Sequence, residues 1–208
     1  MKFQDKASQA FPIFVLDRIY EEPANFCYGL AMLCRDACTI GIPADGAPAG
    51  GGLGSNDAFL DQDVPLAAQL RAMIADAVAL YHKNAAPRMY EGPPSVRGFA
   101  IKARAHIQRG QQSFHAAFDP SSLYAGTFCV AVPSHVVQNE SEGGHVVLEN
   151  PLPPAMRRRA GATLKSSFQI RAEQGLMLVF PAFLPMTVPR FSGGAERIAL
   201  VFEAIPQF

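Results

Sequence analysis

The sequence predicts a single globular domain in which an antiparallel β-sandwich or barrel carries two helices on one outer face. Apolar residues recur at helical spacing in two segments of the first half, residues 23–38 and 63–85. From about residue 95 onward, β-branched and aromatic residues gather in short segments separated by Pro, Gly, Ser and Asn. Because the helices precede the strands and do not alternate with them, a parallel βαβ architecture is not expected.

Two amphipathic helices are predicted in the N-terminal half. Residues 23–38 place Phe26, Leu30 and Leu33 at helical spacing, and their first residue is a proline, which suits a first turn. In residues 63–85, Asp63 is the candidate N-cap. The apolar stripe of this second helix comprises Leu66, Leu70, Met73, Ile74, Ala77, Val78 and Tyr81. Such a stripe must pack against a hydrophobic surface.

The segment between the helices is predicted to be a loop. Residues 41–57, GIPADGAPAGGGLGSND, are too rich in Gly and Pro to hold regular structure. The GGGLGS run lacks a following Gly-Lys-Ser/Thr, so no nucleotide site is expected there. Strands are predicted further along the chain, over residues 96–107, 123–132, 145–150, 166–173, 175–184 and 197–205.

Composition and charge exclude several kinds of partner. Lys plus Arg and Asp plus Glu number 18 each in 208 residues, so neither nucleic acid nor an anionic membrane is expected to bind. No apolar run approaches the roughly 18 residues of a membrane span, and residues 1–20 lack the apolar core of a signal peptide. We therefore expect a cytoplasmic protein whose four cysteines, Cys27, Cys34, Cys38 and Cys129, are reduced and buried.

Four segments carry a pattern that belongs to one class of oxygenases. They are GGGLGSNDAFL (50–60), HAAFDPSSLYAGTFCVAVP (115–133), GGHVVLENP (143–151) and GLMLVFPAFLPMTVPRFSGGAERIALVFEAI (175–205). In these segments and their order the chain resembles the 2-oxoglutarate- and Fe(II)-dependent oxygenases, in particular a bacterial family of that type. The resemblance implies a double-stranded β-helix, a cupin-like jelly roll, over about residues 95–208, with a helical part over about residues 1–94 of the single domain 1–208.

The chemistry of that superfamily explains the pattern. Its Fe(II) is held by two histidines and one carboxylate, which leaves three positions open for 2-oxoglutarate and O2. Two ligands come from a His-x-Asp or His-x-His pair, because alternate residues of a strand face the same side. A distant His supplies the third ligand. An Arg further along pairs its planar guanidinium with the far carboxylate of the cosubstrate.

The resemblance implies that only part of this set is present here. His115 falls on the first ligand position, but its paired position is Ala117 and the distal His position is Met186. Arg197 falls on the position that binds the cosubstrate carboxylate. Neither a methyl group nor a thioether suits ferrous iron, since thioethers prefer softer metals. We therefore predict that ordinary Fe(II) binding is lost.

Several residues leave alternatives open. Asp119 could replace the missing carboxylate, but it also fits a turn in Asp-Pro-Ser-Ser. His106, His135 or His145 could approach the same site from neighbouring strands. His115 equally fits a polar residue that is hydrogen-bonded inside the barrel.

Arg197 is open to two interpretations. If it faces the barrel interior, it would form a pocket for a carboxylate. It could instead pair with an acidic residue of the protein, for which the candidates are Glu149, Glu196 and Glu203.

The expected function is that of a 2-oxoglutarate/Fe(II) oxygenase-like protein that is non-catalytic or functionally shifted. It would bind a small anionic or apolar ligand through Arg197 and His115, with no resident cofactor. The alternative is an active dioxygenase with a rearranged metal site, which would use His115 and Asp119 together with Fe(II) and 2-oxoglutarate. A third hypothesis is a structural or interaction protein whose own side chains fill the barrel. Exposed jelly-roll edges make a homodimer a reasonable assembly.

Overall fold

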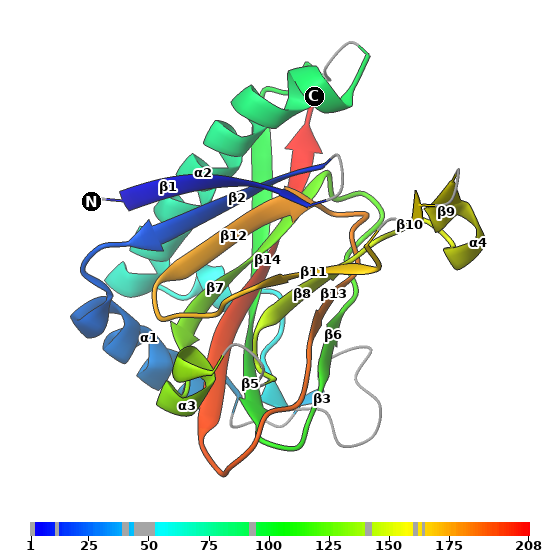
Figure 1. Ribbon diagram of the computed structural model, residues 1–208. Coiled ribbons are helices and arrows are strands. Elements are labelled where there is room, and N and C mark those ends of the chain that lie inside the picture. Colours follow the sequence, from blue (N-terminus) through cyan, green and yellow to red (C-terminus); the bar gives the residue numbers. More distant parts are fainter. Residues whose placement is uncertain are drawn as a thin grey trace.

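Two antiparallel sheets face each other in this protein. The computed structural model describes residues 3–10, 13–38, 42–43, 53–91, 95–139, 143–159, 162–163 and 165–208. Helices α1 (Pro23–Cys38) and α2 (Pro65–Met89) cover the outer face of the larger sheet, and the smaller sheet lies across its inner face (Figure 1). The predicted architecture of an antiparallel sandwich with two helices on one face is confirmed.

The larger sheet has eight strands in the order β1-β2-β12-β7-β14-β5-β4-β3. The strands that were predicted from the sequence are β5 (Gly98–Arg109), β7 (Tyr124–Ala131), β12 (Leu176–Pro181) and β14 (Glu196–Gln207). The others were not predicted: β1 (Phe3–Ala10), β2 (Ile13–Tyr20), β3 (Ile42–Pro43) and β4 (Leu53–Gly54). The N-terminal part of the chain therefore contributes four strands to the larger sheet, in addition to the two helices that cover it. Of the predicted loop 41–57, residues 41 and 44–52 lie outside the described residues.

The smaller sheet has four strands in the order β11-β8-β13-β6. These are β6 (Phe114–Ala116), β8 (Val146–Glu149), β11 (Ser167–Ile170) and β13 (Met186–Val188). Short elements lie outside both sheets: the 3-10 turn η1 (Phe59–Asp61), α3 (Ser134–Gln138), α4 (Pro154–Arg157), and the strand pair β9 (Arg158–Arg159) and β10 (Ala162–Thr163).

Both predicted helices are present, and α2 packs as its apolar stripe predicted. Leu70, Ile74 and Val78 are fully buried between α2 and the larger sheet. The predicted cap is wrong, because Val64 and not Asp63 occupies the N-cap position and no side chain caps the helix. Pro65 begins the helix, where its missing N–H costs nothing.

The two faces of the larger sheet bury different kinds of side chain. On β14, alternate residues Ile198, Leu200, Phe202 and Ala204 belong to the apolar core beneath the helices. The residues that alternate with them, which include Arg197 and Glu203, face the smaller sheet across the interior of the barrel. The inner face therefore carries the chemically distinctive groups of the sheet.

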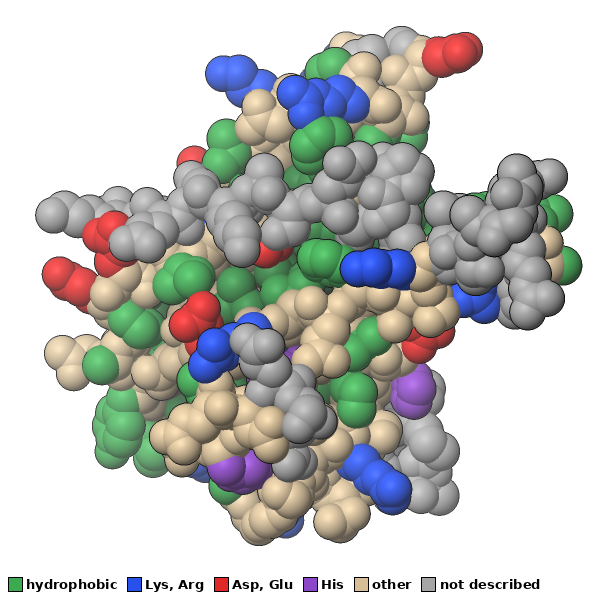
Figure 2. Space-filling view, in the orientation of Figure 1, with side chains coloured by type: hydrophobic (Ala, Val, Ile, Leu, Met, Phe, Trp, Pro, Cys, Tyr) green, Lys and Arg blue, Asp and Glu red, His purple; other side chains and the backbone are tan. Residues whose placement is uncertain are grey.

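On the face shown in Figure 2, basic, acidic and apolar side chains are interspersed, and charges of one sign do not cluster. All four cysteines are buried free thiols, as predicted. None of the helices in the described part of the chain combines the length and the hydropathy needed to cross a membrane.

Candidate functional site

A group of buried polar side chains lies on the inner face where β14, β5 and β7 run side by side. We call Arg197, His106, Gln108 and Cys129 the Arg197 cluster. Arg197 stands directly opposite Gln108 in the β14–β5 register, and His106 and Cys129 both stand opposite Ala199. The register thus brings residues from three strands onto one patch of the barrel wall.

Arg197 is the largest fully buried side chain of the cluster. It is 1% exposed, and its Nη2 donates to Cys129 Sγ at 3.6 Å, while its Nε has no hydrogen-bond partner. Burial raises the pKa of the Cys129 thiol, which the guanidinium opposes. Arg197 is thus a cation whose neighbour is a weak, neutral acceptor.

The alternative in which Arg197 pairs with an acidic residue is not found in the described part of the chain. Glu196 instead pairs with Arg35 and Arg109, and Glu203 pairs with Arg104. No ion pair joins Arg197 to Glu149 or to any other described carboxylate. A buried guanidinium without a counter-ion is costly, so this position is suited to an anion that comes from outside the chain.

His106 lies beside Arg197 and has no partner for either ring nitrogen within the described structure. Its ring stacks on Phe114, with 3.9 Å between ring centroids. This contact covers one face of the imidazole and does not use its two nitrogens, which lie at the ring edge. Burial lowers the pKa of His106 to about 3, helped by the nearby cations of Arg197 and Arg104. The imidazole is therefore neutral near pH 7 and offers one donor and one acceptor.

Gln108 has a fixed amide orientation. Its Nε2 lies 2.5 Å from the carbonyl oxygen of Gln112 and 3.3 Å from those of Val188 and Pro189. Only an N–H group can face three carbonyl oxygens, so the oxygen of the amide must point the other way. Gln108 Oε1 is buried and has no partner among the described residues.

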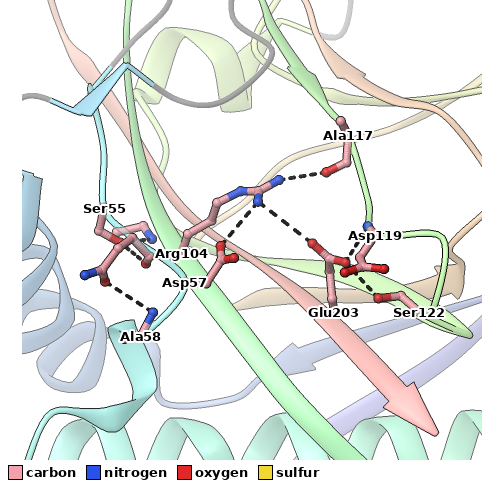
Figure 3. Close-up of polar contacts among 10 residues, drawn as sticks. Ser55, Asp57, Ala58, Arg104, Ala117, Asp119, Ser122 and Glu203 are labelled. Atoms are coloured by element: carbon pink, nitrogen blue, oxygen red, sulfur yellow. Dashed lines mark hydrogen bonds and ion pairs between the residues drawn. The ribbon is translucent and has the colours of Figure 1, made fainter.

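A second polar group, which we call the Arg104 network, lies further along the same inner face (Figure 3). Arg104 Nη1 lies 3.8 Å from Glu203 Oε1 and 3.4 Å from Asp57 Oδ1, and Arg104 Nη2 donates to the carbonyl of Ala117 at 2.8 Å. Glu203 Oε2 accepts from the backbone N–H of Asp119 and from Ser122 Oγ, both at 2.7 Å. Unlike Arg197, Arg104 is thus compensated by carboxylates.

The structure places the predicted first metal ligand away from the interior. Phe114 and Ala116 pair with Val188 and Met186, which belong to the inner core, whereas His115 between them is exposed and pairs with Thr187 on the outer side. His115 therefore does not contact the Arg197 cluster, and the structure gives no support to its role as an interior ligand-binding residue.

Asp119 and Ala117 are also exposed. The Asp119 carboxylate accepts hydrogen bonds from Ser121 N at 2.8 Å and Ser121 Oγ at 2.7 Å, which lower its pKa. This is the turn that its sequence context favoured. The alternative in which His115 and Asp119 converge on one ion does not match these positions.

The inward positions of β6 and β13, Phe114, Ala116, Met186 and Val188, carry no group that suits Fe(II). Met186 is 1% exposed and pairs with Ala116 on one side and Leu148 on the other. Across all described residues, no three His, Cys, Asp or Glu side chains lie close enough to hold a metal ion. The residues therefore do not fit a facial triad for Fe(II).

The other two candidate histidines have structural partners. His145 Nδ1 accepts from the backbone N–H of Ala172 at 3.1 Å, so its Nε2 carries the proton and faces the carbonyl of Asn139. His135 Nε2 lies 2.9 Å from the carbonyl of Ser192. Of the three histidines that were proposed as replacements, only His106 reaches the interior next to Arg197.

The sequence contained a signal for the cluster. In residues 103–108, Ala-Arg-Ala-His-Ile-Gln, polar residues alternate with apolar ones, which is the period of a strand with one apolar and one polar face. Because the apolar face packs under helices, the polar face had to be the interior of the barrel. Gln108 was missed because the sequence of the strand does not show that its amide nitrogen donates to the carbonyls of Gln112, Val188 and Pro189.

Comparisons place this architecture among known folds. Neither the protein-family models nor the curated proteins give a match to the chain. A prolyl-4-hydroxylase from Pseudomonas putida superposes with a TM-score of 0.61 at 13% identity, over 93% of this chain and 93% of that one. A Trichoplax adhaerens prolyl hydroxylase, solved with a hypoxia inducible factor peptide fragment, gives 0.62 at 11% identity over 92% and 83%.

A third solved structure is HygX from Streptomyces hygroscopicus, which contains nickel and 2-oxoglutarate. It superposes with a TM-score of 0.59 at 10% identity, over 93% of this chain and 83% of that one. Identities this low establish the fold and do not transfer site residues. The resemblance predicted from the sequence is confirmed at that level: the chain has the double-stranded β-helix fold of the 2-oxoglutarate/Fe(II) oxygenases.

Proposed function

We propose that the chain is a non-catalytic or functionally shifted relative of the 2-oxoglutarate/Fe(II) oxygenases that binds a small carboxylate ligand against Arg197, without a metal. The observation that carries the proposal is a guanidinium that is 1% exposed, has an unpartnered Nε and forms no ion pair with a described residue. A planar guanidinium can hold a carboxylate through two parallel hydrogen bonds. An incoming carboxylate would thus supply the missing counter-charge.

The remaining groups of the cluster favour a small ligand. His106 and Gln108 add a neutral imidazole and a buried amide oxygen beside Arg197. These groups orient a bound molecule through hydrogen bonds, and the neutral imidazole does so without adding a second charge. Small-molecule sites commonly combine a few convergent polar groups with an apolar wall, and the inner face supplies both kinds of side chain.

The rival function is an active dioxygenase with a rearranged metal site. It needs three ligands that converge on one ion, and His115 and Asp119 are exposed, with the Asp119 carboxylate bound to Ser121. Because the positions of these residues do not favour it, we keep it as an outcome of the test.

Calorimetric titration distinguishes the two functions. Protein freed of metal with a chelator is titrated with glutarate and 2-oxoglutarate, and the titration is repeated anaerobically with Fe(II), followed by measurement of succinate release. We expect carboxylate binding that is independent of metal and no succinate. The Arg197→Met variant should bind at least tenfold more weakly, because it loses a charge-assisted pair worth about 1.5–3 kcal/mol.

Arg109→Met is the matched control, because Arg109 is an exposed arginine on the neighbouring strand that pairs with Glu196. It should bind carboxylates as the wild type does. Stoichiometric Fe(II) binding with succinate formation would establish the rival function. Failure of every carboxylate to bind would indicate a barrel filled by its own side chains.

A further inference from the structure

We propose, on the basis of this carboxylate site, that the ligand is a 2-hydroxy acid: its carboxylate pairs with Arg197 and its hydroxyl donates a hydrogen bond to Gln108 Oε1. Each atom of the cluster that lacks a partner needs a complementary group on the molecule that binds there. A 2-oxo acid, which has no donor beside its carboxylate, does not meet these needs.

Gln108 has only an acceptor atom left for a ligand. Its amide nitrogen is held by the carbonyls of Gln112, Val188 and Pro189, so the side chain cannot flip to present a donor to the interior. Gln108 is 0% exposed, and its Oε1 has no partner among the described residues. A buried acceptor of this kind is stabilised by an O–H or N–H donor and is destabilised by another acceptor.

Gln108 and Arg197 are paired residues on adjacent strands, with side chains on the same face. Side chains in such pairs are close neighbours, with Cβ atoms about 5 Å apart. A carboxylate on Arg197 and its α-substituent therefore lie within reach of the Gln108 side chain.

A hydroxyl group suits this position better than an ammonium group. An α-ammonium group would also donate, but it would bring a positive charge beside the buried cation of Arg197, with Arg104 nearby on β5. Like charges repel strongly where water is excluded. A neutral hydroxyl donates without this cost and can also accept a hydrogen bond from His106, whose ring nitrogens are unpartnered.

A matched ligand series tests the inference on the wild-type protein. Metal-free protein is titrated calorimetrically with glutarate, 2-oxoglutarate, both enantiomers of 2-hydroxyglutarate, and glutamate. Propionate, pyruvate, lactate and alanine carry the same four substituents next to the carboxylate (hydrogen, oxo, hydroxyl and ammonium) on a shorter carbon chain, and they are titrated in the same way. One added hydrogen bond to a buried acceptor predicts that one hydroxy enantiomer binds about tenfold more tightly than the unsubstituted acid. The 2-oxo acid should bind more weakly than the hydroxy acid by at least the same factor.

The outcomes separate this inference from the proposed function. Binding of the unsubstituted or 2-oxo acid with an affinity equal to or above that of the hydroxy acid overturns the inference and leaves carboxylate binding intact. Tighter binding of glutamate or alanine overturns the choice of a hydroxyl. No binding by any member of either series overturns the proposed function itself.

A variant assigns the preference to Gln108. In Gln108→Met the ratio of affinities for hydroxy and unsubstituted acids should fall to about one, because the acceptor is removed. Gln207→Met, an exposed glutamine at the end of the same sheet, is the control and should keep the wild-type ratio. Thermal unfolding checks that both variants fold. If Gln108→Met does not fold, the ligand series on the wild type decides alone.

Discussion

The two faces of the large sheet differ in how completely they satisfy their polar atoms. On the helix side, Leu200 and Phe202 lie in an apolar core, and the hydroxyl of Tyr81 at its edge donates to the carbonyl of Phe14 at 2.7 Å. On the barrel side, which the alternate residues of the same strands face, Arg197 and His106 are equally buried but have nitrogens without hydrogen-bond partners.

This difference indicates that the two faces of one sheet have different roles. Sequences that fold well normally satisfy buried polar atoms, and departures from that rule concentrate at functional sites. The helix side should therefore determine stability, whereas the barrel side should lower stability in exchange for binding.

The largest effect is expected on the helix side. Phe202 is 0% exposed in the apolar core, and Phe202→Ala should lower the free energy of unfolding by about 3–5 kcal/mol, because it leaves a cavity. Urea denaturation measures the loss. Phe183, which is 55% exposed in the turn after β12, is the control, and Phe183→Ala should change stability by less than about 0.5 kcal/mol. Similar losses in both variants would contradict the assignment of the core.

The next effect concerns acid stability on the barrel side. The folded-state pKa of His106 is about 3, below its ordinary value of 6.5, so the unfolded chain binds one more proton between these two values. Stability should therefore fall as the pH drops from about 6.5 towards 3, by up to about 1.4 kcal/mol per pH unit. His106→Gln should flatten this slope in urea titrations at several pH values, whereas the exposed His115→Gln should keep it. An unchanged slope in His106→Gln would contradict the burial of a neutral imidazole.

A smaller effect of opposite sign is expected at Arg197. Without ligand, Arg197→Met should raise the free energy of unfolding by about 2 kcal/mol, because it replaces a buried cation that lacks a counter-ion with an apolar chain. Arg109→Met removes only an exposed ion pair with Glu196 and should change stability by less than about 1 kcal/mol. A destabilised Arg197→Met protein would show that the cation already has a partner.

The smallest effect is expected in the Arg104 network. Glu203→Gln weakens the acceptor for the Asp119 backbone N–H and for Ser122, and should cost about 1 kcal/mol. It should also speed hydrogen exchange at the Asp119 amide, which nuclear magnetic resonance can follow. Glu196→Gln, at a more exposed carboxylate near the other end of the strand, should leave that amide unchanged. Equal exchange in both variants would remove Glu203 as the anchor of this segment.

The sequence predicted the helices and the four central strands of the larger sheet, because periodicity records which side chains are buried. The apolar stripe from Leu66 to Tyr81 and the apolar runs of β7 and β12 can be identified from the amino-acid sequence alone. β1 was missed because its residues mix polar and apolar types. β2 begins with the apolar run Ile13–Leu16, but its place in the sheet depends on pairing with β12, far along the chain.

The site was only partly predictable, because it depends on register. Arg197 was identified by its position in the sequence, and its burial on the inner face agrees with the interpretation of an interior arginine. His115 was chosen by its place in a motif, but in β6 a shift of one residue moves a side chain from the inside to the outside. No local pattern specifies that register, which is set by pairing with β13.

The most direct test observes the guanidinium itself. In metal-free protein labelled with 15N, the Nε–H resonance of Arg197, identified by its absence in Arg197→Lys, is followed as glutarate is added. We predict that this resonance shifts and that its exchange with water slows as the carboxylate pairs with it. A resonance that does not move at saturating glutarate, or that moves only after Fe(II) is added, would contradict a metal-free carboxylate site in this barrel.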